Sequence, residues 1–470
     1  MVVGGLRETV AGLEATIAEL SGMVAELNRT LAAREEALAA RDARIAELEK
    51  LLAESRRSGK RQSAPFSKGA PKDDPARPGR KSGDEHGRHG HRAAPVTPDR
   101  ELEAPLPGCC PHCGGAVDHE RDAEQWQVDL PEVHPTVTRF VVGVGRCRRC
   151  GRRVQGRHPE QTSDALGAAA SQVGPGAKAW AAWLHYELGL SFGKCARLLG
   201  RLGIPVTAGA LCSGAQATGR ALVPVHQEIV RRVNQAPMVV MDETGWKVEA
   251  CSAWLWVATA EGVTAYWVAD GRGFDEATLL LDANYAGVLV RDGWAPYRKY
   301  EAATHQSCVA HLLRRCHEMI DDNPAWARGT PRQVKDLLLE GLASRDLPAR
   351  RRKEVAADLI DRIELLADQA HPYDANRKLV AHLYNERQAI FTFLTRSGVD
   401  ATNWRGEQAV RPAVVNRKVW GGNRTWPGAG TQSRIMSVLR TAAQQGIDAI
   451  DWLARYARAP DLTLVPLFTQ

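Results

Sequence analysis

The sequence lacks any hydrophobic run long enough to cross a membrane. No stretch approaches the roughly 18 consecutive apolar residues that a spanning helix needs. The first residues, up to Leu6, contain no basic segment followed by a continuous apolar core, so we expect no secretory signal. Cysteine is also sparse, with 10 in 470 residues, which excludes a disulfide scaffold. These absences predict a cytoplasmic protein without membrane partners.

The length and the charge distribution indicate several domains with one basic tract. A chain of 470 residues corresponds to about two to four domains. Residues 55–100 contain twelve Lys and Arg but only five Asp and Glu, so this tract carries the whole net charge of +7. Residues 55–102 are rich in Gly, Pro and Ser and have no apolar periodicity, which predicts a disordered linker. It is either a polyanion-binding arm or a solubilising linker.

The first 54 residues show a heptad pattern. Two series of residues seven apart, starting at Leu6 and Val10, run to Leu48 and Leu52, and twelve of these fourteen positions are apolar. Only two arginines interrupt them. Seven heptads with a regular apolar stripe are typical of a coiled coil, because a single straight helix drifts by about 20° per heptad. We expect residues 1–54 to form a homo-oligomer, although packing on the same chain remains open.

Two Cys-x-x-Cys pairs, each followed by Gly, predict a zinc ribbon in residues 103–160. The pairs are Cys110 with Cys113 and Cys147 with Cys150. Two such turns can aim four thiolates at one structural Zn²⁺ ion. A redox-active dithiol is the alternative. The segment between the pairs, which ends in a valine-rich stretch at Val137 to Val144, is expected to be rich in strands.

Residues 172–225 are expected to form a helix-turn-helix-like DNA-binding domain. One amphipathic run extends from Ala177 to Leu188, Ser191 can cap a second helix, and Thr207 can cap a third. A break at residues 203–205 separates the second and third helices. This order fits a helix-turn-helix, and ordinary three-helix packing fits it equally well.

From Pro237 the pattern changes to strands that end in acids. Three strands (238–241, 254–259 and 263–268), a crossover with a helix (270–286) and a fourth strand (287–292) follow the order of a ribonuclease-H-like fold. The first strand ends at Asp242 and the fourth at Asp292. If these strands are neighbours, the two carboxylates lie together and can hold a divalent cation through hard oxygen ligands.

A third acid is expected from a later helix. A long helical region, residues 333–393, separates the strands from Glu407, which lies 115 positions after Asp292. Glu318 and Asp321 are rival third ligands because they are closer in sequence. Glu243 adjoins Asp242 but should point to the opposite face of its strand.

Several motifs together resemble a bacterial DDE transposase of the insertion-sequence 66 type. In the N-terminal part they are the coiled coil, the basic linker and the two Cys-x-x-Cys pairs. In the catalytic part they are Met241 to Trp246, Arg291 to Tyr297, Cys308 to Arg315 and Asn403 to Lys418. The resemblance implies that Asp242, Asp292 and Glu407 form a catalytic triad that uses Mg²⁺ or Mn²⁺. It also implies cleavage and rejoining of double-stranded DNA at transposon ends and target, in the bacterial nucleoid. Whether small accessory proteins take part stays open.

The resulting organisation is a multidomain α+β protein. The N-terminal domains above precede a ribonuclease-H-like catalytic core in two parts, residues 235–320 and 399–458, with a helical insertion at 321–398. The alternative is a non-catalytic or domesticated DNA-binding regulator of transposase origin, since the N-terminal domains fit both functions. Only the three acids distinguish the two.

Overall fold

The computed structural model describes residues 93–468 and, nearer the N-terminus, residues 12, 19–32, 34–36, 38, 41 and 45. The chain divides into two compact units, Met1–Pro65 with Arg139–Gln470, and Phe66–Thr138. The basic linker lies almost wholly outside the described residues, as does much of the coiled-coil segment. In the parts that are described, no helix is long and apolar enough to cross a membrane.

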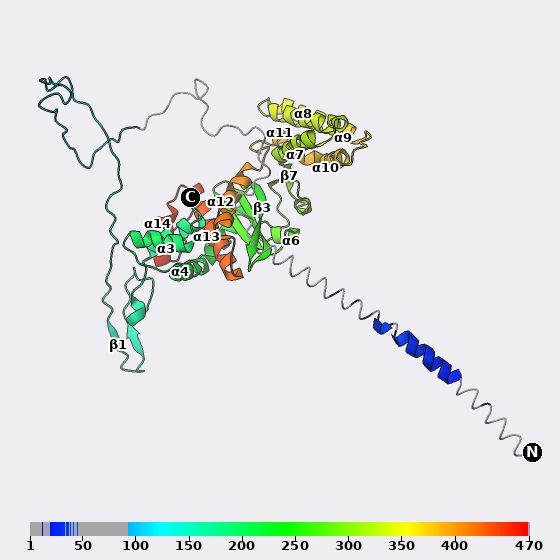
Figure 1. Cartoon of the computed structure of the whole chain (residues 1–470), viewed down its shortest axis with the longest axis horizontal. Helices are drawn as coiled ribbons and strands as arrows, with labels where there is room; N and C mark the ends of the chain where they lie inside the picture. Colours follow the sequence, from blue (N-terminus) through cyan, green and yellow to red (C-terminus); the bar gives the residue numbers. More distant parts are fainter. Residues whose placement is uncertain are drawn as a thin grey trace, which may run out of the picture. The chain divides into compact units, whose positions relative to one another are not determined.

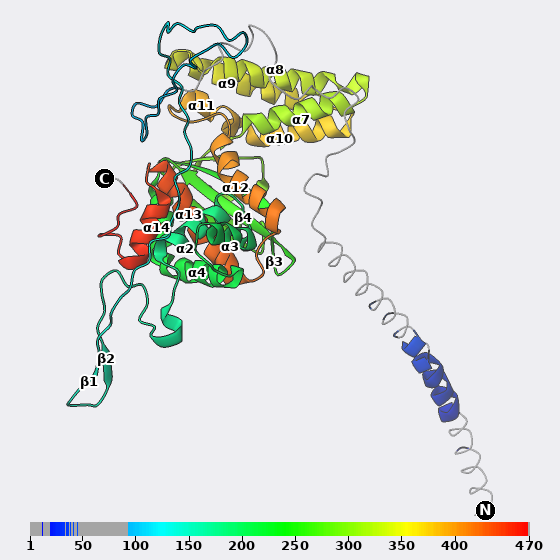
Figure 2. The ribbon, with the colours of Figure 1, turned by 60° about the vertical axis from the view of Figure 1, so that its left-hand side comes forward.

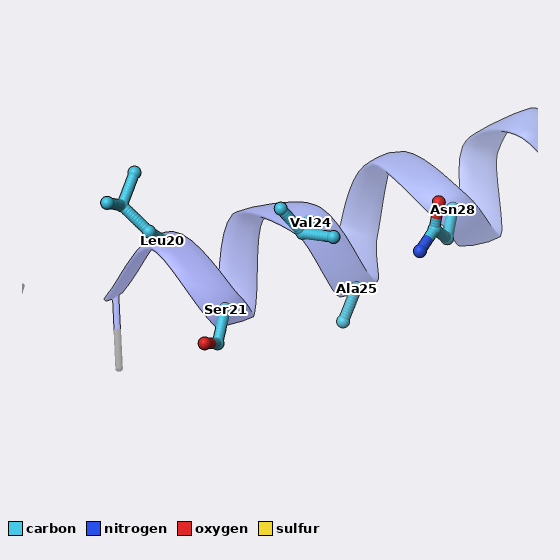
Figure 3. A pocket seen from close by; sticks show the side chains of 5 residues that line it. All are labelled: Leu20, Ser21, Val24, Ala25 and Asn28. Atoms are coloured by element: carbon cyan, nitrogen blue, oxygen red, sulfur yellow. The ribbon is translucent and has the colours of Figure 1, made fainter. Parts of the chain in front are cut away.

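Residues 19–32 form a continuous helix with exposed apolar side chains. Leu20, Val24, Leu27 and Leu31, which belong to the heptad stripe, are all more than half exposed. Figure 3 shows Leu20 and Val24 projecting from one side of this helix and Ser21 and Ala25 from another, with a shallow groove between them. The helical part of the prediction is therefore confirmed for these residues.

Five strands form one mixed sheet in the order β5-β4-β3-β6-β7. Figure 1 labels two of them, β3 and β7. Their bounds are Met238–Val248 (β3), Cys251–Ala260 (β4), Val263–Ala269 (β5), Val288–Arg291 (β6) and Thr304–Ser307 (β7). The first three are antiparallel neighbours, and β6 and β7 add in parallel to β3. This mixed sheet with many helices is consistent with the ribonuclease-H-like fold expected from the sequence.

The first strand is longer than predicted. We expected it to end at Asp242, but β3 continues to Val248, where it pairs with Cys251 of β4. The two connecting residues, Glu249 and Ala250, have φ values of 54° and 65°, the backbone of a tight two-residue hairpin. Neither residue is the Gly or Asn that is typical of such a turn, so the hairpin could not be predicted from the residue types. The crossover also differs, because its only helix in the described structure is the four-residue α6 (Phe274–Ala277).

The helices α2 to α5 lie directly before the sheet in the sequence. Their bounds are Pro175–Tyr186 (α2), Phe192–Arg201 (α3), Ala208–Ala221 (α4) and Val223–Gln235 (α5). Both predicted caps are confirmed: the hydroxyl of Ser191 accepts the N–H of Lys194, and that of Thr207 accepts the N–H of Ala210. The sequence did not predict α5 as a separate helix. Because α2 packs on α14 (Ala449–Arg458) and α4 on α13 (Trp426–Gln444), these helices are integrated with the C-terminal part of the chain.

Hydroxyl groups of α13 satisfy the free edge of β5. The backbone N–H groups of Thr264, Tyr266 and Val268 donate to the side-chain oxygens of Thr441, Ser437 and Ser433, at 3.1, 2.8 and 3.1 Å. The three hydroxyl residues are four positions apart on one face of the helix, which matches the two-residue spacing of the strand. An edge strand that would otherwise expose its N–H groups is thereby closed.

Helices inserted after β7 cover the other edge of the sheet. Their bounds are Val309–Asp322 (α7), Gly329–Ala343 (α8), Ala349–Ala367 (α9), Asp374–Ile390 (α10) and Thr392–Thr395 (α11). They share a hydrophobic core of their own, and Figure 2 shows them as one group. Their core includes residues of α7. We expected the insertion to begin at residue 321, which lies at the end of α7, but α7 packs with the inserted helices. The side chain of Gln306 in β7 contacts Ile390 and Phe393 of the group.

Candidate active site

Asp242 and Asp292 lie at the same level on adjacent parallel strands. In the β3–β6 register Val240 is the partner of Val290, so each acid lies two residues beyond a paired position. The parallel pairing ends there, while β3 continues alongside β4. Asp292 follows the last residue of β6, and its carboxylate accepts the N–H of Trp294 at 2.8 Å. The strands that carry the two acids are thus neighbours, which is the condition that the sequence analysis set for the two carboxylates to lie together.

Helix α12 (Trp404–Trp420) carries Glu407 in its first turn. The glycine before it, Gly406, lets this turn approach β3 closely, since a Cβ at Gly406 would lie 3.2 Å from the Cβ of Asp242 and 3.8 Å from its Oδ2. Glu407 is partly exposed and lies 3.7 Å from the Nε2 of His311 and 3.6 Å from Arg314, both on α7. Glycine is therefore a packing requirement at this position, and sequence reasoning missed it.

The electrostatics of Asp242 reflect its acidic surroundings. Burial raises the pKa of Asp242 to about 7, and the negative charges of Glu243, Asp292 and Glu407 add to the effect. A hydrogen bond from the N–H of Glu243 opposes it only in part. Glu407 on α12 is thus a later acid whose charge acts on Asp242.

Glu243 has hydrogen-bonding and ionic partners of its own. Its carboxylate is buried, receives a hydrogen bond from Tyr297 and pairs with Arg272 at 2.6 Å. Burial raises the pKa of Glu243, and these two partners oppose that effect. The Arg272 guanidinium lies over the rings of Trp254 and Trp294, at 4.6 and 4.0 Å from their centroids. The ring of Trp294 is thus already packed on this arginine.

Some basic residues near Glu407 have partners within the protein, and others are exposed to solvent. Arg417 donates to the Gly245 carbonyl and the Thr244 hydroxyl, so it ties α12 to β3. Arg405 pairs with Asp400 at 3.3 Å. Arg411 and Lys418 are exposed. Trp404, at the start of α12, is 44% exposed, which leaves its ring accessible to a ligand.

The acidic group fits a divalent cation in its chemistry. Its donors are the hard carboxylate oxygens that Mg²⁺ and Mn²⁺ prefer. At the start of α12, the buried side-chain amide of Asn403 has no hydrogen-bond partner, and neither does Nδ1 of His311, which is typical of a site that takes up an ion or water. Within the described residues no three His, Cys, Asp or Glu side chains are already arranged as a ligand set, so the carboxylates must rotate to share an ion.

The two cysteine pairs form matching turns. In the unit containing residues 66–138, Cys110 accepts the N–H of Gly114 and donates to Gly115, both at 2.8 Å. In the other unit, Cys147 accepts the N–H of Gly151 and donates to Arg152, both at 2.9 Å. Backbone N–H groups lower the pKa of the Cys110 thiol, from His112 and Cys113, and that of Cys147, from Cys150 and Arg149. Each turn, taken by itself, has the backbone of a zinc knuckle.

The segment between the knuckles contradicts one expectation. We predicted strands there, but residues 114–143 form neither helix nor strand, and the hairpin found within residues 103–160 is β1 (Val144–Arg146) with β2 (Arg153–Gln155) around the second knuckle. The side chains of Val128, Val137 and Val141 are exposed. A valine-rich run forms a strand only where a partner strand and a buried face are present.

The five-stranded mixed sheet and the helices around it are consistent with a domain of the ribonuclease-H-like class. Residues 170–431, more than half of the chain, match the family described as Transposase IS66 family. The chain belongs to this family.

One relative is the uncharacterized protein y4qI of Sinorhizobium fredii (strain NBRC 101917 / NGR234). It is 24% identical over 317 residues, which cover 59% of this chain and 58% of the relative. The chain thus matches less than two thirds of the length of that protein, whose name gives no activity. The family match extends from before α2 into α13, so the acids and the helical insertion all lie inside it.

Proposed function

We propose that the protein is a DDE transposase that binds the ends of an insertion sequence and catalyses metal-dependent DNA cleavage and strand transfer. The triad is Asp242, Asp292 and Glu407. The observation that carries the proposal is the convergence of the three acids, two in register on β3 and β6 and one on α12, whose charge acts on Asp242.

Each acid has a separate part in this function. Asp242 and Asp292, on the sheet, and Glu407, on α12, would hold a divalent cation. Mg²⁺ or Mn²⁺ bound there would supply activation of the attacking water or hydroxyl and stabilisation of the leaving oxygen. His311 and Arg314 lie 3.7 and 3.6 Å from Glu407, where they would contact the phosphate backbone of DNA at the site.

Cleavage of a labelled transposon end tests this function. Asp292→Asn and Glu407→Gln should each abolish cleavage in Mg²⁺ or Mn²⁺, by at least about a hundredfold, because an amide cannot hold the ion. End binding in a gel shift should be retained. Glu318→Gln, an exposed acid on α7, is the matched control and should cleave normally.

The outcomes separate the alternatives. If Glu318→Gln fails to cleave and Glu407→Gln cleaves, the third ligand is misassigned. If the unmodified protein binds its ends but never cleaves with either metal, it is a non-catalytic DNA-binding regulator.

DNA binding is assigned to the helical segment and to the basic tract. Helix α3 exposes Lys194, Arg197 and Arg201 beside a surface hollow. Their spacing places the three charges on one face of the helix, where they can neutralise phosphates. Residues 55–100 extend this contact without reading base sequence.

Self-association is assigned to residues 1–54. The exposed stripe that includes Leu20, Val24 and Leu27 is the kind of surface that a second helix of the same sequence covers. Figure 3 shows a groove on this helix between the ridge of Leu20 and Val24 and that of Ser21 and Ala25, into which partner side chains can pack. Light scattering should show a lower mass when residues 1–54 are deleted, and an unchanged mass would contradict the assignment.

A further inference from the structure

A fully buried ion pair connects the helical insertion to the strand that carries Asp292. Arg291, the last residue of β6, and Glu386, on α10, are 2% and 0% exposed in their side chains and lie 2.6 Å apart. They are 95 positions apart in the sequence. Neither side chain of the pair is exposed to solvent, so the geometry of the pair is fixed by packing and not by water.

Arg291 also holds the backbone of its neighbour. Its NH1 atom donates to the carbonyl of Asp292 at 2.9 Å and to the hydroxyl of Ser307 in β7 at 2.9 Å. Its Nε lies 3.3 Å from Nδ1 of His305. One guanidinium therefore joins β7, the insertion and the peptide unit of Asp292.

The same helix touches the next residue of this turn. A Cβ at Gly293 would lie 2.6 Å from Cε1 of His382, one turn before Glu386 on α10. The turn at Asp292 and Gly293 is thus contacted from α10 twice, through His382 and, by way of Arg291, through Glu386. The acid on β3 has no such contact among the described residues.

The charges around Glu386 keep it ionised in spite of its burial. Burial raises the pKa of Glu386, but the charge of Arg291 and hydrogen bonds from Ser307 and Arg291 more than offset this, so that the pKa is lowered. Ser307 donates to Oε2 at 2.5 Å, and the Nε of Arg298 lies 3.6 Å from Oε1. His382 and His305, which also face this group, have pKa values lowered by burial and stay neutral.

A buried ion pair is weak evidence for stability, because removing two charges from water costs about as much as their attraction returns. It does impose one geometry on the groups that it joins. We propose that Glu386 and Arg291 are positioning residues, through which the insertion fixes the orientation of Asp292 for binding a divalent cation. This inference rests on the proposed function.

Mn²⁺ binding to the purified full-length protein tests the inference without relying on cleavage. Glu386→Gln should weaken Mn²⁺ binding by about 10–100-fold, the range typical for loss of a group that orients a metal ligand. The Mn²⁺ concentration that gives half-maximal end cleavage should rise in parallel. Glu364→Gln is the matched control, because Glu364 on α9 forms a partly exposed ion pair with Arg387, the neighbour of Glu386 on α10. The Mn²⁺ affinity of this variant should stay within about twofold of that of the unmodified protein.

A double variant, Arg291→Met with Glu386→Met, covers the case in which Glu386→Gln does not fold. Replacing both charges by apolar side chains should preserve the fold, as judged by circular dichroism. Mn²⁺ affinity should remain weak, because the Asp292 carbonyl has lost its donor. Wild-type Mn²⁺ affinity in either variant would overturn the inference and leave the proposed function standing. Absence of Mn²⁺ binding in the unmodified protein would overturn both.

Discussion

Replacing Asp242 by asparagine should stabilise the metal-free protein while abolishing its cleavage activity. The pKa of Asp242 is raised to about 7 by burial and by the acids around it, against about 3.9 in an unfolded chain. At 1.36 kcal/mol for each pH unit, keeping this carboxylate ionised in the folded state costs up to about 4 kcal/mol. Asparagine keeps the shape of the side chain and removes that cost.

The direction of the pKa shift of Asp242 determines how the stability difference between the wild type and the variant depends on pH. Between about pH 4 and pH 7 the native state binds the extra proton and the unfolded state does not, so the stability of the wild type falls as the pH rises through this window. The advantage of Asp242→Asn should therefore be small at pH 4, grow up to about pH 7 and stay constant above it.

Thermal unfolding in EDTA at several pH values measures this difference. At pH 8 the variant should melt on the order of 10 °C higher than the wild type. Millimolar Mg²⁺ should raise the melting temperature of the wild type and not that of the variant. Asp361→Asn, an exposed aspartate on α9, is the control and should change neither. Equal melting temperatures at pH 8, or a difference that does not vary with pH, would refute the reasoning.

Three further predictions concern the rest of the chain. Ser437→Ala leaves the buried N–H of Tyr266 without an acceptor and should lower the free energy of unfolding by about 1–3 kcal/mol, against no change for the exposed Ser213→Ala. Cys147→Ser should lose about one Zn²⁺ per chain in metal analysis, whereas Cys251→Ser, another exposed cysteine, should keep it; equal zinc content would contradict the ribbon. Deleting residues 55–100 should weaken DNA binding for all sequences and flatten its salt dependence; a loss confined to transposon ends would argue against a phosphate-binding arm.

Local chemistry made much of the fold predictable. Ser191 and Thr207 cap helices where the sequence placed them, because a cap depends on residues only three positions away. The order of the strands and the position of an acid at the end of β6 were also predictable, whereas the pairing of β3 with β6 was only a condition of the argument. The full length of β3 did not, since its hairpin uses Glu249 and Ala250 in a conformation that these residue types do not announce.

Long-range pairing was beyond the sequence. A stripe of hydroxyl residues at four-residue spacing can be recognised in the sequence at Ser433, Ser437 and Thr441. The stripe itself does not indicate that β5 is the element it contacts. The pair of Arg291 and Glu386 is likewise a product of packing, because each residue taken alone reads as an ordinary surface charge. Prediction failed where a residue's role is set by a partner far away in the chain.

The helical insertion is more than a spacer between Asp292 and Glu407. Helix α10 contacts the turn at Asp292 through Glu386 and His382, and α7 places His311 and Arg314 beside Glu407. Asp242 is fixed differently, by the register of β3 and the close approach of Gly406. Changes that loosen the insertion should therefore disturb the second and third acids and leave the first in place. If the three acids bind an ion as proposed, the insertion would determine whether they act as one site, since an ion held by one carboxylate is bound weakly.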